Sequence, residues 1–331
     1  MKARTARITR TGGPEVIEWV DHDLSAPGPG EATVRHTAVG LNFIDTYHRS
    51  GLYRLDLPSG LGGEAVGVVE AVGEGVAAVR PGDRVGSFGP SRGAYATARN
   101  VPAAELLPIP DDIDDEVAAT LLLKGGTTEY LVERCAKVRA GQTALVYAVA
   151  GGVGHLLAAW LKALDVTVIG TAGSAAKAAQ ARAAGVAHVI EHKREKVVER
   201  VRAITGGRGV DVVFDGVGMA MWDTSLKSVA RRGLIASFGN TGGAVEGVAL
   251  GALAAHGSLF VTRPTMFDYY VTPEERAAGM ARVWDMLRAG AISPDIGQRF
   301  PLDRAADAHR ALEAGATRGA TVLTLGGGQP G

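Results

Sequence analysis

The segment that most constrains the fold is a glycine-rich stretch, Ala150-Gly151-Gly152-Val153-Gly154. It follows a short apolar run at 144–148 and leads into an apolar helical pattern at 155–164. Glycines let the backbone turn tightly and approach a pyrophosphate, and the free N–H groups of the helix N-terminus attract the anion. An ordinary strand–helix turn would also explain a lone glycine loop. The order strand, loop, helix and second strand favours a dinucleotide site.

The loop departs from the common G-x-G-x-x-G pattern. Gly151 and Gly154 match its second and third glycines, whereas Val149 stands at the first. A valine there requires a negative φ, so we expect a less tight turn.

Around this loop, strands and helices alternate from about residue 114 to residue 264, which predicts a parallel sheet with helices on both faces. The first 120 residues instead read as short strands between Gly/Pro turns, typical of a small barrel-like β domain. Helices at 273–289 and 303–314 and a strand at 320–325 follow. With 331 residues, two domains are expected: residues 1–122 completed by 265–331, and residues 123–264.

Composition narrows the function classes. Lys+Arg and Asp+Glu both total 35, so zero net charge gives no support for a nucleic-acid or membrane-surface partner. No apolar run is long enough to span a bilayer. Cys135 is the only cysteine, which excludes an intramolecular disulfide and a multi-cysteine zinc site, and fits a cytoplasmic location.

The end of the second strand indicates which dinucleotide binds. NAD-binding units usually carry an acidic residue there to hold the ribose 2′-OH. Here residues 167–171 run into Ala172-Gly173-Ser174 with no acid, and Lys177 follows one turn later. A helix N-terminus and a lysine without an acid form a site for a 2′-phosphate. We therefore expect NADPH. Lys177 alone could equally be a solvated helix lysine; His192 and Lys193 could add to the same pocket.

This architecture resembles the medium-chain dehydrogenase/reductase superfamily. Its zinc alcohol dehydrogenases place a histidine ligand in a segment that matches Leu61-Gly62-Gly63-Glu64, where Gly63 takes the histidine's place. No metal site is expected. His188 and His192 have H-x-x-x-H spacing, but along an extended strand this spacing separates them by roughly 13 Å.

Within the superfamily, several blocks resemble the zinc-free NADPH:quinone oxidoreductases (ζ-crystallin-like), in the same order as in that family. These blocks are Thr11-Gly12-Gly13-Pro14-Glu15-Val16, Gly40-Leu41-Asn42-Phe43-Ile44-Asp45-Thr46-Tyr47, Arg49-Ser50-Gly51-Leu52-Tyr53, Leu57-Pro58-Ser59-Gly60-Leu61-Gly62, Leu123-Lys124-Gly125 and Ala236-Ser237-Phe238-Gly239-Asn240. The resemblance implies an α/β fold: a Rossmann-type doubly wound parallel sheet domain plus a GroES-like β-barrel catalytic domain.

The resemblance also implies site residues. Asn42, Asp45, Tyr47 and Tyr53 become the candidates for shaping the substrate and nicotinamide site. For Asp45, a buried turn held by Asn and Asp side chains is about as good an interpretation; for Tyr53, a half-exposed aromatic at the mouth of the site is a somewhat better one. The implied cofactor-binding residues are Asn42, Tyr47, Lys124, Thr127, Tyr130, Gly151, Gly152, Val153, Gly173, Ser174, Lys177, His192, Val217, Phe238, Gly239, Asn240, Phe260, Val261, Arg263 and Arg318.

The expected reaction is reduction of a quinone by NADPH, with Tyr47 or Tyr53 donating a hydrogen bond to the developing oxyanion. Two alternatives stay open: reduction of enones or other activated C=C bonds, and a non-enzymatic role as an NADPH-binding structural or RNA-binding protein.

A homodimer is also expected. The apolar strand 258–262 should end the dinucleotide sheet, and an edge strand of this kind invites pairing with its copy. The alternative is a monomer in which a loop or the helix 273–289 covers this edge.

Overall fold

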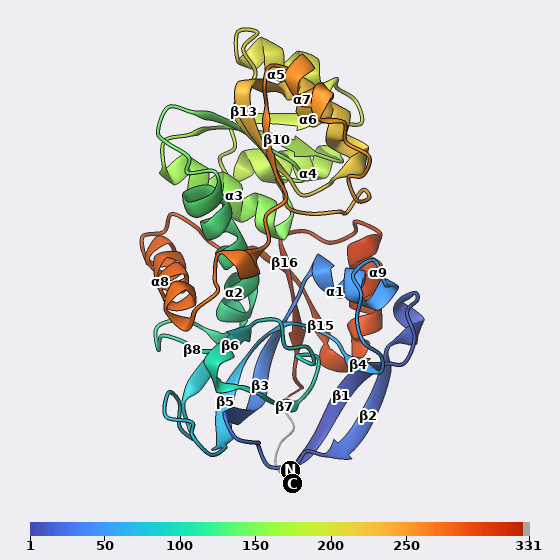
Figure 1. Cartoon of the computed structure of the whole chain (residues 1–331), viewed down its shortest axis with the longest axis vertical. Helices are drawn as coiled ribbons and strands as arrows, with labels where there is room; N and C mark the ends of the chain where they lie inside the picture. The colour runs from blue at the N-terminus through green and yellow to red at the C-terminus, as the bar shows by residue number, and fades with distance from the viewer. Residues whose placement is uncertain (327–331) are drawn as a thin grey trace. The chain divides into compact units, whose positions relative to one another are not determined.

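The computed structural model describes residues 1–326, and contacts between residues divide the chain into two units. Unit 1 comprises Met1–Leu123 and the residues from Pro294 onward, and unit 2 comprises Lys124–Ser293 (Figure 1). The last five residues of the chain lie outside the described part.

Unit 1 is built mainly from antiparallel strands. One sheet has the order β15-β16-β3-β5-β6-β8 with β7 paired to β3, and a smaller sheet has the order β2-β1-β4. The strands are β1 (Lys2–Ile8), β2 (Glu18–Asp23), β3 (Glu31–Leu41), β4 (Ser59–Gly60), β5 (Glu64–Val72), β6 (Arg84–Phe88), β7 (Ala98–Pro102), β8 (Leu106–Pro108), β15 (Ile296–Pro301) and β16 (Ala320–Thr324).

Strand β3 organises this unit because it pairs with three partners. Its first half bonds to β7, its second half to β16, and β5 runs along most of its other side. Two irregularities in the β3–β5 register bend the sheet. The predicted barrel-like β architecture of the first 120 residues agrees with these pairings.

Two helices and three short 3-10 turns complete unit 1. They are α1 (Phe43–Ser50), α9 (Ala305–Glu313), and the turns Pro14–Val16, Ala103–Glu105 and Leu302–Arg304. Helix α1 begins directly after β3 with a capping box formed by Asn42 and Asp45. It ends at Gly51, whose φ of 86° lies in the left-handed region that favours glycine.

Unit 2 contains a parallel sheet in the order β11-β10-β9-β12-β13-β14. Its strands are β9 (Thr143–Val146), β10 (Thr167–Ala172), β11 (His188–Glu191), β12 (Val210–Asp215), β13 (Val229–Ser237) and β14 (Phe260–Thr262). All five strand pairs are parallel. This is the 3-2-1-4-5-6 order of doubly wound dinucleotide folds, with the reversal between β9 and β12. The predicted parallel sheet is confirmed.

The helices of this unit are α3 (Gly152–Ala163), α4 (Ala175–Ala183), α5 (Val197–Ile204), α6 (Trp222–Ser228), α7 (Leu250–Ala255) and α8 (Pro273–Arg288), with 3-10 turns at Met219–Met221 and Met266–Asp268. Helix α2 (Asp115–Glu129) begins in unit 1 and continues in unit 2 into a π-helical turn, Tyr130–Cys135. Fully buried side chains such as Leu145, Ile169 and Phe214 form the core around the sheet.

Residues 265–293 differ from the expected domain division, which placed them with the first domain. By contacts they belong to unit 2. The hydroxyl of buried Tyr270 donates to the Glu129 carboxylate at 2.7 Å, and the Arg282 guanidinium pairs with Glu133 at 2.9 Å. These long-range bonds carry no signal in the local sequence pattern, which explains the difference.

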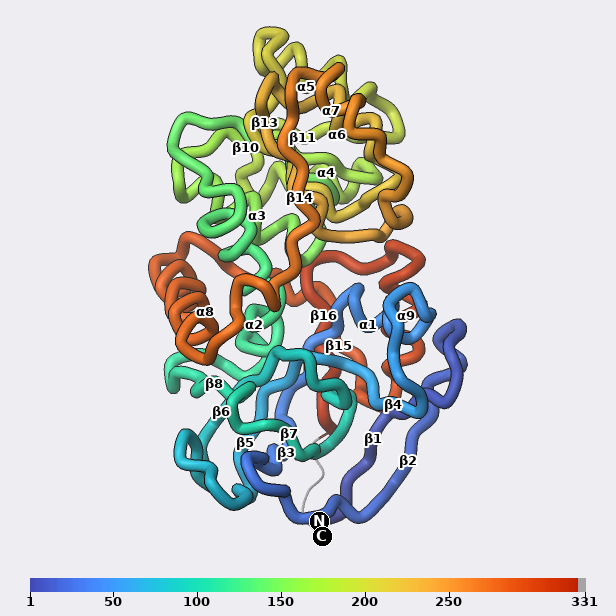
Figure 2. Tube along the Cα trace, in the orientation of Figure 1, coloured from blue at the N-terminus to red at the C-terminus, as the bar shows by residue number. Residues whose placement is uncertain are grey.

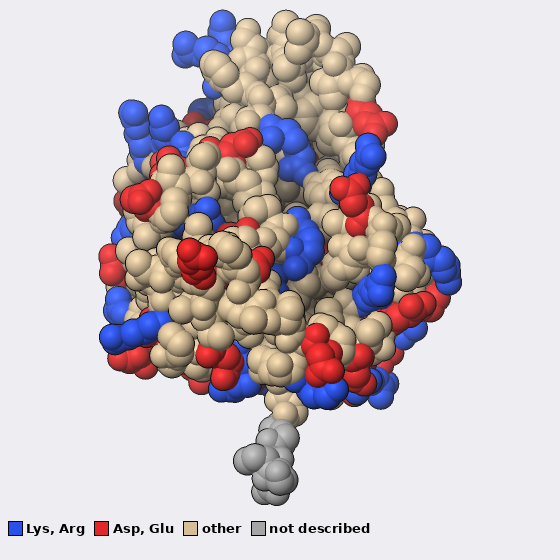
Figure 3. Space-filling model, turned by 60° about the horizontal axis from the view of Figure 1, so that its bottom comes forward, with Lys and Arg blue, Asp and Glu red and all other residues tan. Residues whose placement is uncertain are grey.

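No helix among the described residues is long and apolar enough to cross a membrane. On the face drawn in Figure 3, Lys and Arg side chains are interspersed with Asp and Glu side chains. That face offers no broad patch of one sign, in agreement with the balanced composition.

Candidate active site

The carboxyl ends of the six parallel strands bring most of the predicted cofactor residues to one edge of the unit 2 sheet. Figure 2 traces the chain through β10, β11, β13 and β14. In α/β sheets of this kind, ligands bind at this edge, where the strand order reverses. The residues that follow the strand ends are Gly151, Gly152 and Val153 after β9, Gly173, Ser174 and Lys177 after β10, His192 after β11, Val217 after β12, Phe238, Gly239 and Asn240 after β13, and Arg263 after β14.

The glycine-rich loop turns sharply after β9. Ala148 has a φ of 50°, in the left-handed region, whereas Val149 is not among the residues with positive φ. The left-handed residue of the turn therefore lies one position before the first glycine of the G-x-G-x-x-G pattern. The Gly151 amide donates to the Ala148 carbonyl at 2.8 Å, and Gly151 caps α3. A Cβ on Gly154 would lie 2.3 Å from the Ala148 carbonyl oxygen, so only glycine allows α3 to pack this closely.

The residues predicted to bind the 2′-phosphate come from the segments that follow β10 and β11. Ser174 caps α4 and its hydroxyl accepts a hydrogen bond from the Lys177 amide at 3.3 Å. The His192 ring comes within 3.4 Å of a Cβ placed on Gly173, so a side chain at position 173 would touch it. Burial, then the charge of Lys193, lowers the pKa of His192. This pocket carries donors and no carboxylate from the end of β10.

Asp215, at the end of β12, holds the next two loops in place. Its Oδ1 accepts from the amides of Val217 and Gly218, both at 2.8 Å, and its backbone carbonyl accepts from the Phe238 amide. Burial raises the pKa of this carboxyl. A Cβ on Gly239 would lie 2.4 Å from the Gly216 carbonyl oxygen, so the loops after β12 and β13 pack backbone to backbone.

Arg263 fastens the end of β14 to this group, because its guanidinium donates to the Ser237 carbonyl at 3.0 Å. Phe260 and Val261 lie elsewhere, along β14 itself, where 64% and 39% of their surfaces are exposed. Because β14 has only three residues, both lie within three residues of Arg263.

Three predicted residues lie on α2 and the turn that follows it. Lys124 is buried, Thr127 is half-buried with its hydroxyl 4.0 Å from the Met266 sulfur, and Tyr130 is buried against Tyr269 in a stacked pair with centroids 4.9 Å apart. Tyr130 thus packs within unit 2 on one ring face. Arg318 lies in unit 1, where its amide donates to the Gln298 side chain at 3.2 Å.

In unit 1, Asn42 and Asp45 belong to a buried chain of hydrogen bonds. The Asn42 amide nitrogen Nδ2 donates to Glu64 at 2.7 Å, and the Asn42 backbone N–H donates to Asp45 Oδ2 at 3.0 Å. The Tyr95 hydroxyl donates to the same carboxylate at 2.9 Å and lies 3.0 Å from His309. Glu64 also accepts from the Leu123 backbone amide at 2.7 Å.

The chain continues through buried Arg49 to Glu313. The guanidinium lies 3.3 Å from His309 Nδ1 and forms two hydrogen bonds with the Glu313 carboxylate. It thereby ties α1 to α9, elements more than 250 residues apart in sequence. For Asp45, this arrangement favours the interpretation of a buried turn held by side chains, so we treat it as a positioning residue.

Tyr47 and Tyr53 lie together on an aromatic cluster beside α1. Their rings meet edge to face with centroids 5.2 Å apart, and the Tyr53 ring also contacts His48 at 5.9 Å. Phe43, one turn before Tyr47, is 37% exposed with its ring 6.3 Å away. Both tyrosines are half-buried.

Gly63 matches the position of the zinc alcohol dehydrogenase histidine, and an arginine lies beside it. A Cβ on Gly63 would come within 3.1 Å of Arg92 Nη1. Among residues 1–326, no three His, Cys, Asp or Glu side chains are grouped so that they could hold a metal ion.

Sequence reasoning missed Arg92, His48, Tyr95, His309 and Asp215. None lies in a recognisable motif, and Arg92, Tyr95 and His309 reach the candidate residues only through contacts distant in sequence. Glu64 was visible in the Gly62-Gly63-Glu64 block, but nothing in that block shows that its carboxylate bonds Asn42.

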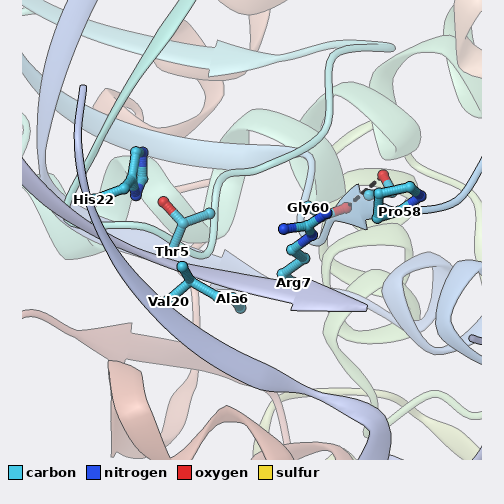
Figure 4. A pocket seen from close by; sticks show the side chains of 8 residues that line it. Thr5, Ala6, Arg7, Val20, His22, Pro58 and Gly60 are labelled. Atoms are coloured by element: carbon cyan, nitrogen blue, oxygen red, sulfur yellow. Dashed lines mark hydrogen bonds between the residues drawn. The ribbon is translucent and has the colours of Figure 1, made fainter. Parts of the chain in front are cut away.

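Unit 1 also has a hollow on its surface. It is lined by residues of β1, β2 and β4, including Thr5, Arg7, Val20 and His22, and by Pro58, which precedes β4 (Figure 4). It contains none of the predicted site residues.

Two family models match the chain. The alcohol dehydrogenase GroES-like domain matches residues 28–111, and the zinc-binding dehydrogenase family matches residues 152–281. A quinone oxidoreductase of Pseudomonas aeruginosa is 47% identical over 97% of this chain and 99% of its own length. This degree of similarity over nearly the whole length decides the family. The chain belongs to the quinone oxidoreductases of the medium-chain dehydrogenase/reductase superfamily.

Two further comparisons bear on cofactor and substrate. The crystal structure of the Escherichia coli quinone oxidoreductase complexed with NADPH is similar with a TM-score of 0.95 and 42% identity, covering 97% of this chain and 99% of that one. A 2-haloacrylate reductase of a Burkholderia species is 39% identical over 96% of this chain and 98% of its length. The GroES-like and Rossmann-type fold implied by the resemblance is confirmed.

Asp45 generates a prediction for pH dependence. Burial raises its pKa from 3.8 to about 6, against the hydrogen bonds from Asn42 and Tyr95. Between these values the folded protein binds more protons than the unfolded chain, so stability should fall as the pH rises from about 4 to about 6, by on the order of 3 kcal/mol. The Asp45→Asn variant should lack this loss, and denaturant unfolding at several pH values measures the difference.

Asp21→Asn is the matched control, because Asp21 is exposed and outside the buried chain. If wild type and Asp45→Asn keep a constant difference in unfolding free energy between pH 4 and 6, the raised pKa is refuted.

Proposed function

We propose that this protein reduces quinones with NADPH. The observation that supports this most is the pocket at the end of β10, where Gly173, Ser174, Lys177 and His192 offer donors to a 2′-phosphate and no acid to a 2′-OH. The similarity to quinone oxidoreductases over nearly the whole chain supports the substrate class.

The donor set at the sheet edge fits NADPH. The N-terminus of α3 and the glycine loop suit the pyrophosphate, and the α4 N-terminus with Lys177 suits the 2′-phosphate. When bound, NADPH supplies the hydride. The loops after β12 and β13, fixed by Asp215, would position the nicotinamide half, and Arg263 would hold the end of β14 beside them.

In unit 1 the chain's own residues would orient the substrate. We assign Tyr47 and Tyr53 to contact with a planar quinone, since their edge-to-face packing fixes both rings. A tyrosine hydroxyl of this cluster would donate a hydrogen bond to the quinone oxygen as negative charge develops on it. Asn42 and Asp45 would hold α1, and with it Tyr47, in place through the buried chain.

The test of the substrate class is a comparison of NADPH oxidation with simple benzoquinones and with simple enones under the same conditions. We expect kcat/KM to be higher for the quinones. Higher kcat/KM for the enones would instead favour the alternative of an NADPH-dependent reductase of activated C=C bonds, which the similarity to a 2-haloacrylate reductase supports weakly.

We expect activity to survive exhaustive chelation. Gly63 provides no ligand, and a quinone is already electrophilic without a Lewis acid. The measurement is turnover before and after chelation, with metal content determined on the purified protein. Stoichiometric zinc lost together with activity would contradict the prediction.

NADPH should bind more tightly than NADH, and Lys177→Ala should weaken NADPH selectively. The lost charge-assisted hydrogen bond should raise the KM for NADPH about tenfold and leave that for NADH nearly unchanged. Lys196→Ala is the control, because Lys196 is an exposed lysine paired with Glu199. Equal effects of Lys177→Ala on both cofactors would refute the assignment.

We also propose a homodimer formed through β14. This strand pairs with β13 on one side and has no neighbouring strand on its other side among the described residues, and its Phe260 and Val261 side chains are exposed. An open edge of apolar residues favours pairing with its copy across a two-fold axis.

Light scattering at micromolar concentration should give a mass near twice 34.2 kDa. Val261→Pro removes an N–H and should shift the protein towards monomer, whereas Val261→Thr keeps the backbone donor and the β-branched shape and should not. A wild-type mass near 34.2 kDa would rule out the dimer.

The domain roles and the location complete the proposal. Unit 1 would contribute substrate contacts and unit 2 cofactor contacts, with 265–293 counted in unit 2. The single cysteine, Cys135, is a free thiol, in keeping with the expected cytoplasmic location.

A further inference from the structure

Arg92 lies in the loop after β6, at the position that the missing side chain of Gly63 leaves open. Its Nη1 donates to the Gly89 carbonyl at 3.0 Å and would be 3.1 Å from a Cβ on Gly63. Its Nη2 lies 3.1 Å from His48 Nε2. Any larger residue at position 63 would push against the guanidinium.

The charge of Arg92 has no carboxylate counterpart. Arg49, Arg84 and Arg134 are also buried or partly buried, and each forms an ion pair with a carboxylate. No ion pair within 4.0 Å joins Arg92 to another residue of the described chain, 1–326.

The two carboxylates whose charge acts on Arg92, Asp45 and Glu105, each accept a hydrogen bond from another group, although Glu105 Oε2 has no partner. Asp45 accepts from the Asn42 amide and from Tyr95, and Glu105 accepts from the Ser91 hydroxyl at 2.7 Å. Burial lowers the pKa of Arg92, because partial removal from water disfavours the charged form of the guanidinium. A guanidinium with five N–H donors keeps capacity for an anion here.

His48 orients this guanidinium without neutralising it. Burial, then the charge of Arg92, lowers the pKa of His48 to about 4, so the ring is neutral at pH 7 and Nε2 accepts from Arg92. The same ring packs edge to face on Tyr53, with centroids 5.9 Å apart. The cation is therefore one side chain away from the aromatic cluster of Tyr47 and Tyr53.

We infer that Arg92 binds a carboxylate carried by the substrate, so that this protein prefers quinones or activated alkenes with an acid group on or next to the unsaturated ring or bond. This inference rests on the proposed function. A planar guanidinium matches a carboxylate with two parallel hydrogen bonds, and the adjacent aromatic rings match a planar unsaturated body. Gly63 provides the space and His48 the orientation.

The test uses 1,4-naphthoquinone-2-carboxylate and its methyl ester with NADPH. The readout is the ratio of kcat/KM for the acid to that for the ester. Arg92→Met should lower this ratio about 10- to 100-fold, mainly through the KM for the acid, because a hydrogen-bonded charge pair is lost. Gly63→Val should lower it too, because it displaces the guanidinium and leaves the charge present.

Arg35→Met is the matched control, because it removes an exposed arginine of unit 1 that is paired with Glu70. An unchanged ratio in that variant shows that the effect is local. If Arg92→Met lowers turnover of acid and ester equally, or leaves the ratio unchanged, the inference is overturned.

A binding measurement separates this inference from the proposed function. Calorimetry with benzoate should detect binding to the wild type and not to Arg92→Met, and neither result needs turnover. Benzoate binding with no quinone reduction would refute the proposed function alone. Quinone reduction with equal benzoate affinity in wild type and variant would refute the role of Arg92 alone.

Discussion

The parallel pairing of β9 with β10 on one side and β12 on the other determines where chemistry can take place in unit 2. Parallel strands deliver all their carboxyl ends to one edge, and the reversal of strand order at β9 and β12 opens the connections to either side there. The glycine loop, the Lys177 pocket and the loop held by Asp215 come from distant parts of the chain. They share one edge because all six strands of this sheet run parallel.

In unit 1 a chain of hydrogen-bonded, mostly buried polar groups fixes the positions of the candidate site residues. Its members come from β5, from α1 and its cap, from α9 and from the loop before β7, and they are Glu64, Asn42, Asp45, Tyr95, His309 and Arg49, with the exposed Glu313 at the end. Removing one member would leave a neighbour buried without its partner, which costs more than the bond itself contributes. This explains why α1 can present Tyr47 in a fixed direction although the helix has only eight residues.

Arg49 and Arg92, both in unit 1, illustrate how the surroundings of an arginine decide whether its charge serves the fold or a ligand. Arg49 is buried and meets the Glu313 carboxylate, so its charge is used within the fold. Arg92 is partly buried, bonds a carbonyl and a neutral imidazole, and keeps its charge available. The same residue type therefore supports a helix contact in one place and a ligand contact in the other, and only the partners distinguish them.

Local patterns in the sequence were enough to predict the parallel sheet of unit 2 and many of the residues that follow its strand ends. Apolar β runs, helical periodicity and glycine at 151 and 154 act within a few residues, so they determine strand, loop and helix in order, and the missing acid after β10 is visible at once. Tertiary structure alone decided that Ala148 takes the left-handed turn, that 265–293 joins unit 2 through Tyr270, and that Arg92 lies beside Gly63. These outcomes depend on contacts between residues far apart along the chain. A long-range contact is set by packing and hydrogen-bond satisfaction over the whole fold, and no short stretch of sequence contains that information.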